Sequence, residues 1–130
     1  MKTKDEAILE LRGTTQGIVS EDSSAEERFQ NQTLRPILKL QNELLLEVFI
    51  NYAKTQKEVF FTLSLSKKQL YIENALQKDV KFSNFLKGII IGLFTIAEYN
   101  EYSQNVSNLN KRIINLLIER FKSQLQLLEK

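Results

Sequence analysis

Apolar side chains recur every three or four residues over the last third of the chain, which is the spacing of one face of an α-helix. The apolar positions between 95 and 128 are Tyr99, Tyr102, Val106, Leu109, Ile113, Leu116, Leu117, Phe121, Leu125 and Leu128. The opposite face is polar, with Asn108, Lys111, Asn115, Glu119, Lys122 and Gln126. The pattern predicts one long helix over residues 95–128 whose apolar stripe lies against another helix.

The length of this predicted helix bears on the oligomeric state. At 1.5 Å per residue it would be roughly 50 Å long. A compact chain of 130 residues has a diameter of only roughly 36 Å. We therefore expect a homodimer, the commonest symmetric assembly, in which a second copy covers the overhanging stripe. The candidate interface residues are Tyr99, Tyr102, Val106, Leu109, Ile113 and Leu116.

A second apolar stretch predicts a long helix over residues 25–56. Ser24 and Glu27 have the spacing of an N-terminal capping box. Pro36 lies inside the stretch and lacks a backbone N–H, so we expect either a kink or a fresh start with Pro36 in the first turn. The polar positions after Pro36 form a narrow stripe. The helix is therefore mostly buried, either centrally in the domain or between two subunits.

Two shorter helices are predicted between the long ones, over residues 67–78 and 81–91, after a loop or short helical turn at 58–65. Ser64 or Ser66 caps the first of them. The second is followed by a glycine suited to a left-handed backbone and then by a further capping-box pair. These three residues are Gly92, Thr95 and Glu98.

Gly88 and Gly92 lie four residues apart, a spacing that allows close packing of another helix. Such packing is the simpler interpretation, and a ligand pocket is the alternative. The fold class is therefore all-α: a helical bundle of two long antiparallel helices, at about 25–56 and 95–128, with two short helices between them. Residues 24–130 form a single helical domain.

Residues 1–23 are expected to form a flexible acidic segment. Residues 7–11 could form one or two helical turns that stop at Gly13, and residues 13–24 have the composition of a linker. Residues 1–28 carry four basic and seven acidic side chains, whereas residues 29–130 carry fourteen and nine. Two separate solvated surfaces are the simplest interpretation, and an acidic segment that folds onto a basic face is the alternative.

Composition narrows the possible chemistry. The chain has no Cys and no His, which excludes disulfides, thiolate zinc sites and every Ser-His-Asp type of triad. The longest apolar run, residues 88–97, has about half of the roughly 20 residues needed to span a bilayer. No apolar core of a secretory signal is present near residue 1. We therefore expect a soluble cytoplasmic protein without a membrane partner.

The remaining candidate sites are weak. The four tyrosines, Tyr52, Tyr71, Tyr99 and Tyr102, could line a pocket, or they could cap the core. Carboxylates are paired at Glu43 and Glu47, and at Glu98 and Glu101. Di-iron bundles also need His, so only an oxygen-ligated Mg²⁺ or Ca²⁺ site competes with a solvated helix face. We expect no metal and no cofactor.

Basic side chains along residues 95–128, at positions 111, 112, 120 and 122, could bind an anion or RNA. They are interspersed with carboxylates, so solubility explains them equally well. The corner around Gly92 is similar to the turn of a DNA-binding helix-turn-helix. The helix after it offers Glu98 and Glu101, which would repel phosphate. A nucleic-acid partner is therefore not expected.

Four stretches carry a resemblance to known proteins: residues 27–39 (ERFQNQTLRPILK), 71–79 (YIENALQKD), 86–92 (LKGIIIG) and 109–112 (LNKR). They resemble a family of small, uncharacterised, all-helical proteins of flavobacteria and related Bacteroidetes. The resemblance covers most of residues 27–128. Members are sometimes labelled glyoxalase. Metal-dependent glyoxalases bind their metal through His and Glu, so a chain without His does not support that label.

Two functions of different class follow from these patterns. The first is a non-enzymatic interaction or regulatory module whose apolar helix stripes serve self-association and the binding of a protein partner. The second is an enzyme or small-ligand-binding protein with a pocket between helices, which would use Tyr, Glu, Lys and Arg chemistry. The absence of His, Cys and any catalytic motif favours the first.

Overall fold

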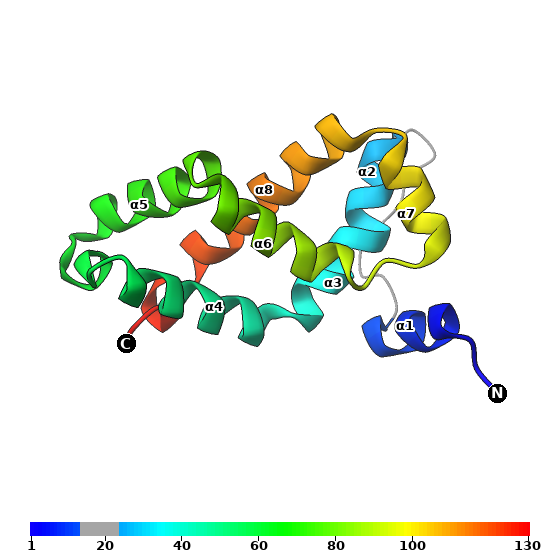
Figure 1. Cartoon of the computed structure of the whole chain (residues 1–130), viewed down its shortest axis with the longest axis horizontal. Coiled ribbons are helices and arrows are strands. Elements are labelled where there is room, and N and C mark those ends of the chain that lie inside the picture. Colours follow the sequence, from blue (N-terminus) through cyan, green and yellow to red (C-terminus); the bar gives the residue numbers. More distant parts are fainter. Residues whose placement is uncertain (14–23) are drawn as a thin grey trace.

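The computed structural model describes residues 1–13 and 24–130, and every regular element within them is helical (Figure 1). The predicted linker at residues 14–23 lies outside the described residues. No helix in the described part of the chain combines the length and apolar character that crossing a bilayer requires. The α-helices are α1 (Lys4–Arg12), α2 (Ala25–Phe29), α3 (Arg35–Leu40), α4 (Asn42–Thr55), α5 (Leu65–Lys78), α6 (Val80–Ile91), α7 (Ile96–Ser103) and α8 (Val106–Ser123).

The predicted helix over residues 25–56 is divided into α2, α3 and α4. Ser24 caps it as predicted, because its hydroxyl accepts a hydrogen bond from the Glu27 N–H at 3.1 Å. A π-helical turn (Gln30–Leu34) separates α2 from α3, and Pro36 lies in the first turn of α3. The π-helical turn, which is wider than an α-helical turn, directly precedes the part of the chain that contains Pro36. A proline cannot be accommodated in the interior of a regular helix. Gln41, with φ −91° and ψ 7°, makes a second break that the apolar pattern did not reveal.

The prediction of one unbroken helix over residues 95–128 is wrong. The helix is interrupted between Ser103 and Val106, where Asn105 has φ −150° and ψ 45°. The Ser103 hydroxyl donates to the Asn100 carbonyl at 2.8 Å, and the Asn105 side chain accepts from the Asn108 amide at 3.1 Å. Short polar side chains of this kind compete with helical backbone bonds and favour helix ends. These local bonds therefore contribute to the break.

The helices α4 and α8, which lie within the two predicted long helices, are also not antiparallel. In Figure 1, α4 and α8 both run from the right of the view to the left, and α5 and α6 provide the return. α8 packs mainly against α5 and α6. With 18 residues, α8 is only about 27 Å long. The overhanging rod that motivated the predicted dimer is therefore absent.

The short elements agree with the sequence. Residues 59–62 form a 3₁₀ turn, and α5 and α6 lie within a few residues of their predicted bounds. Ser64 caps α5, and its hydroxyl accepts from the Lys67 N–H at 3.4 Å. The capping box at α7 is formed as predicted. The Glu98 N–H donates to Thr95 Oγ1 at 3.2 Å, and the Thr95 N–H donates to Glu98 Oε1 at 2.8 Å.

The two glycines of α6 do not act as predicted. Gly92 ends α6 in a right-handed conformation, with φ −59° and ψ −16°, instead of the left-handed one expected. After the helix, the Leu93 N–H donates to the Ile90 carbonyl and the Phe94 N–H donates to the Ile91 carbonyl. These backbone hydrogen bonds span three residues and satisfy the end of the helix, so no left-handed residue is needed. A Cβ at Gly88 would meet nothing within 4 Å. Gly88 therefore faces open space and does not admit a neighbouring helix.

The core is centred on an aromatic cluster, which comprises Phe49, Tyr52, Phe60, Tyr71, Phe82 and Phe121. Phe49 is 0% exposed, and its ring centroid lies 5.0 Å from that of Phe121 and 5.2 Å from that of Phe60. Tyr52 and Phe82 stack at 3.7 Å with an interplanar angle of 6°. The cluster joins α4, α5, α6 and α8 to the 3₁₀ turn and fixes the α5–α6 corner.

Candidate functional site

The predicted interface stripe lies mostly inside the chain. Tyr102, Leu109, Ile113 and Leu116 are all buried in the chain's own core, and only Tyr99 and Val106 are exposed. The Tyr102 hydroxyl is also used internally, since it donates to Asn110 Oδ1 at 2.6 Å. The helices that cover the stripe belong to the same chain. A second copy would therefore need a different surface.

The first helix docks onto the body through a polar contact that we call the Arg12 clamp. The Arg12 guanidinium donates from Nη1 to Glu98 Oε1 at 2.6 Å and from Nη2 to Glu98 Oε2 at 2.9 Å. It also donates to the backbone carbonyls of Gln32 at 3.2 Å and Leu93 at 3.4 Å. The α1 part of the predicted acidic segment thus contacts the body through a basic side chain bound to a carboxylate.

The clamp holds Glu98 in its ionised form. Burial raises the pKa of Glu98, but hydrogen bonds from Arg12, from the Thr33 hydroxyl at 2.7 Å and from the Thr95 N–H together lower it below its ordinary value. A carboxylate that already accepts these bonds is not free to take a proton from a substrate. The clamp is therefore a structural element.

The carboxylate pairs do not form a metal site. Nowhere in residues 1–13 and 24–130 do three or more Asp or Glu side chains gather closely enough to hold a metal ion. Glu43 and Glu47 are exposed on α4. Glu98 is engaged in the clamp, and Glu101 is exposed on α7. The four carboxylates thus lie in different surroundings and do not share one site.

The structure brings two of the four tyrosines together in a shallow groove, which we call the Tyr52–Tyr71 groove. It lies between the end of α4, the 3₁₀ turn and the α5–α6 corner, and its volume is about 730 Å³. It is lined by Tyr52, Gln56, Val59, Tyr71, Asn74, Ala75, Lys78, Asp79, Val80 and Lys81. Tyr99 and Tyr102 lie elsewhere, with ring centroids 6.0 Å apart.

The floor of the groove is rigidly built. Asp79 caps α6 by accepting the Phe82 N–H on Oδ1 at 3.2 Å, and it accepts the Tyr52 hydroxyl on Oδ2 at 2.8 Å. The Tyr52 ring is held on its face by Phe82. One carboxylate therefore fixes both the α5–α6 corner and the orientation of the phenol.

The carboxylate and the two phenols of the groove keep their ordinary charge states at neutral pH. The Tyr52 hydroxyl and the Phe82 N–H lower the pKa of Asp79. Burial raises the pKa of Tyr52, and its bond to Asp79 raises it further. Burial and the Asp79 charge also raise the pKa of Tyr71. The groove thus presents neutral phenols beside a carboxylate that is already hydrogen-bonded.

The edge of the groove is apolar and basic. Val59 and Val80 are 48% and 69% exposed, so they offer aliphatic surface beside the two phenol rings. Lys78 and Lys81 line the same edge. Two lysines and one aspartate give the lining a net charge of +1. In the described part of the chain, neither lysine makes an ion pair.

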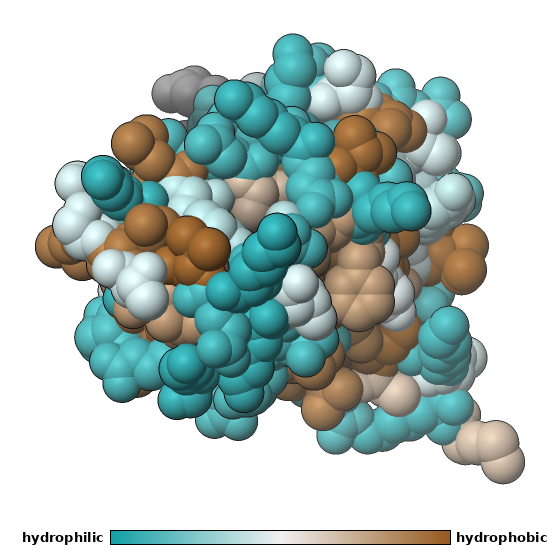
Figure 2. Space-filling model, turned by 60° about the vertical axis from the view of Figure 1, so that its left-hand side comes forward, coloured by the Kyte–Doolittle hydropathy of each residue, from teal (hydrophilic) through white to brown (hydrophobic). Residues whose placement is uncertain are grey.

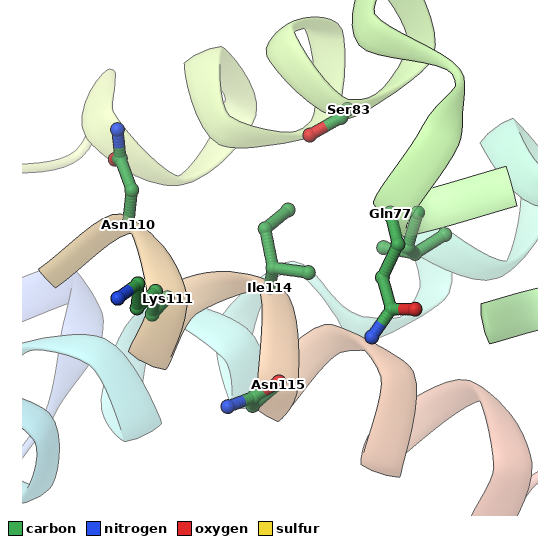
Figure 3. Close-up of a pocket in the computed structure, with 7 residues that line it drawn as sticks. Gln77, Ser83, Asn110, Lys111, Ile114 and Asn115 are labelled. Carbon is green, nitrogen blue, oxygen red and sulfur yellow. The ribbon is translucent and has the colours of Figure 1, made fainter. Parts of the chain in front are cut away.

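A second hollow, which we call the amide pocket, lies between α8 and the α5–α6 corner and has a volume of about 430 Å³ (Figure 3). Figure 3 shows Asn110, Lys111, Ile114 and Asn115 on one helix, with Ser83 opposite. The pocket is lined by Leu76, Gln77, Ser83, Asn110, Lys111, Ile114 and Asn115. Its polar lining is uncharged apart from one ammonium group, so it suits a ligand that exchanges hydrogen bonds with amides.

Comparisons with known proteins add no family to this description. No protein-family model, no curated protein and no solved structure matches the chain. The resemblance of four stretches to Bacteroidetes proteins stays a prediction. The geometry of the grooves alone supports the functional proposals that follow.

The sequence pattern pointed to Tyr52 and Tyr71 but not to the other residues that line the groove. Asp79 precedes a predicted helix and could have been recognised as a cap. Nothing local indicated that it would bind a phenol 27 residues away. Arg12 was missed for the same reason, because its partner lies 86 residues further along the chain.

Proposed function

We propose that this chain is a non-enzymatic interaction module that binds a protein partner through the Tyr52–Tyr71 groove. The observation that carries the proposal is the combination of exposed Val59 and Val80 with two fixed phenol rings in one hollow. Tyr is enriched among residues that dominate binding energy, and apolar anchors fill such hollows. The unpaired lysines at the edge favour an acidic partner.

The charged groups support binding more than catalysis. General acid–base catalysis works best with a group whose pKa lies near the operating pH. Here the pKa values of Asp79 and Glu98 are lowered and those of Tyr52, Tyr71 and Tyr102 are raised. Each of these groups is moved further from neutral pH, where it keeps one charge state.

On one face of the molecule, the exposed apolar surface is distributed in small areas. Figure 2 shows a mostly hydrophilic face on which apolar side chains form separate patches. On α6, Phe85 is 59% exposed and lies one helical turn beyond Lys81. It extends the apolar surface from the groove along α6. A partner that covers both would bury a continuous strip of this helix.

The test is a comparison of two variants in affinity capture from native cells. Val80→Glu places a charge at the edge of the groove, and Val106→Glu makes the same change outside it; both valines are the first residue of a helix. Glu is favourable there, so neither variant should be less stable. We expect the wild type and Val106→Glu to capture the same partner proteins, and Val80→Glu to fail to capture them. Added salt should release the captured proteins. Equal capture by both variants would contradict the proposal.

The homodimer is tested with the same proteins. The positive lining of the groove disfavours pairing of two grooves, so an acidic partner is the preferred occupant. Sedimentation equilibrium of the wild type should give the monomer mass. A dimer that Val80→Glu dissociates would assign the groove to a second copy of the chain. A dimer that only Val106→Glu dissociates would restore the exposed end of the predicted stripe as the interface.

Small-ligand binding in the amide pocket is the second candidate. The observation that favours it is the convergence of neutral hydrogen-bonding side chains from α5, α6 and α8 on one hollow of ligand size. A nuclear magnetic resonance screen with small neutral amides should then shift the signals of Ser83, Asn110 and Asn115. Shifts confined to the Tyr52–Tyr71 groove would favour the first proposal instead.

A further inference from the structure

A third hollow, which we call the arginine pocket, lies where α3 approaches the second half of α8. It has a volume of about 200 Å³ and is lined by Arg35, Leu38, Leu116, Glu119, Arg120, Ser123 and Gln124. Ligand pockets for whole drug-sized molecules usually measure about 300–1,000 Å³. The arginine pocket therefore has room for a single functional group. It opens beside a larger hollow that shares Arg35, Leu116 and Glu119 and is also lined by Lys111 and by the ion pair between Arg112 and Glu26.

The two guanidinium groups of the arginine pocket make few contacts with the described part of the chain. Arg35 donates from Nε to Asn31 Oδ1, and Arg120 donates from Nη1 to Asn42 Oδ1, both at 3.1 Å. Within residues 1–13 and 24–130 neither arginine forms an ion pair or a further side-chain hydrogen bond. A guanidinium carries five N–H donors. Most of the donors of this pair are thus available to a ligand.

The two positive charges affect one another. Burial lowers the pKa of Arg120, and the charge on Arg35 lowers it further, whereas Glu119 acts in the opposite direction. Like charges this close destabilise the folded chain unless an anion lies between them. Glu119 lines the same pocket, but it lies beyond ion-pair distance of both guanidinium groups. One carboxylate compensates only part of two positive charges.

Arg120 is held in place by a pair of amides. Asn42 Nδ2 donates to Gln124 Oε1 at 2.8 Å, and Gln124 Nε2 donates to Asn42 Oδ1 at 2.8 Å. The same Asn42 oxygen accepts the bond from Arg120. This reciprocal pair fixes the guanidinium before any ligand arrives, which reduces the entropy cost of binding.

We propose that the arginine pocket binds a phosphate group, either as inorganic phosphate or as a monoester of a larger molecule. Two guanidinium groups suit phosphate, because their planar arrays of donors match pairs of phosphate oxygens. The site is separate from the Tyr52–Tyr71 groove, so it stands whether or not the groove binds a partner. Lys111 of the adjoining hollow lies where the remainder of an ester would extend.

The experiment uses the full chain and two variants that each remove one positive charge from α3. Both residues are exposed, but Arg35→Gln alters the pocket, whereas Lys39→Gln changes a residue outside its lining, one turn away on the same helix. Thermal unfolding is followed by circular dichroism in sodium chloride and in sodium phosphate of equal ionic strength. Titration calorimetry then measures the affinity for inorganic phosphate and for phosphoserine.

We expect phosphate to raise the unfolding temperature of wild type and Lys39→Gln, and to have at least tenfold weaker affinity for Arg35→Gln. In chloride at low ionic strength, Arg35→Gln should unfold at a temperature no lower than that of wild type, because the repulsion on Arg120 is removed. Binding of phosphoserine as well as inorganic phosphate assigns the site to esters, and binding of inorganic phosphate alone assigns it to the free anion. Equal behaviour in chloride and phosphate, or equal affinity of all three proteins, overturns the proposal.

Discussion

The Arg12 clamp and the aromatic cluster hold two parts of this chain in different ways. The clamp attaches α1 through one guanidinium whose side chain is 3% exposed, bonded to a carboxylate and to backbone carbonyls. The cluster joins four helices through ring contacts with no charge among them. A contact of the first kind depends on a few atoms and on pH, whereas the second is distributed over many dispersion contacts. The two should therefore fail under different conditions.

The largest effect is expected at the centre of the aromatic cluster. Phe49→Ala removes a fully buried ring that touches five other aromatic side chains. Such a truncation leaves a cavity and costs about 3–5 kcal/mol. Denaturant unfolding followed by circular dichroism should show this loss equally at pH 7 and at pH 4. A loss that varied with pH would mean that the bond from Tyr52 to Asp79 couples the stability of the cluster to that carboxylate.

A smaller effect is expected at the clamp. Arg12→Ala leaves Glu98 without its guanidinium partner, a change that costs about 3 kcal/mol at a buried pair. In this variant α1 can detach, and water can then reach the Glu98 carboxylate. The loss of stability is therefore limited to the free energy with which α1 docks on the body. Hydrogen exchange should show α1 losing protection while α4, α5 and α8 keep theirs. Loss of protection in all helices together would show that the clamp supports the whole fold.

The smallest of the three effects is the pH dependence of the same contact. Because the pKa of Glu98 in the folded chain lies below its ordinary value of 4.5, ionised Glu98 stabilises the fold fully above that value. The stabilisation is lost as the pH falls through the lowered pKa. Unfolding temperatures measured from pH 7 to pH 3 should fall less steeply for Glu98→Gln than for wild type. Parallel curves would assign the acid sensitivity to other carboxylates.

The sequence predicted local features well and long-range ones poorly. The caps at Ser24, Ser64 and Thr95 were found, because each depends on a residue three positions away. The break at Asn105 was missed. Its side chain also donates to Glu26 at 2.8 Å, a contact across 79 residues that no local pattern encodes. The apolar stripe of α8 was recognised as one helical face, but spacing alone does not say whether the covering helix comes from the same chain.

The candidate sites follow the same rule. Tyr52 and Tyr71 were singled out as amphipathic residues, yet the groove between them exists only because the α5–α6 corner brings Asp79 and Val80 beside them. The arginine pocket could be predicted even less from the sequence. Arg35 and Arg120 are 85 positions apart by their numbering, and only the packing of α3 near α8 makes them neighbours.

The separation of Arg12 from Glu98 also has a consequence during synthesis. Arg12 is added to the chain 86 residues before the carboxylate that it binds. At a translation rate of about 5–20 residues per second, the interval is roughly 4–17 s. The guanidinium has no carboxylate partner for that time, although another of its acceptors, the Gln32 carbonyl, is added only 20 residues after it.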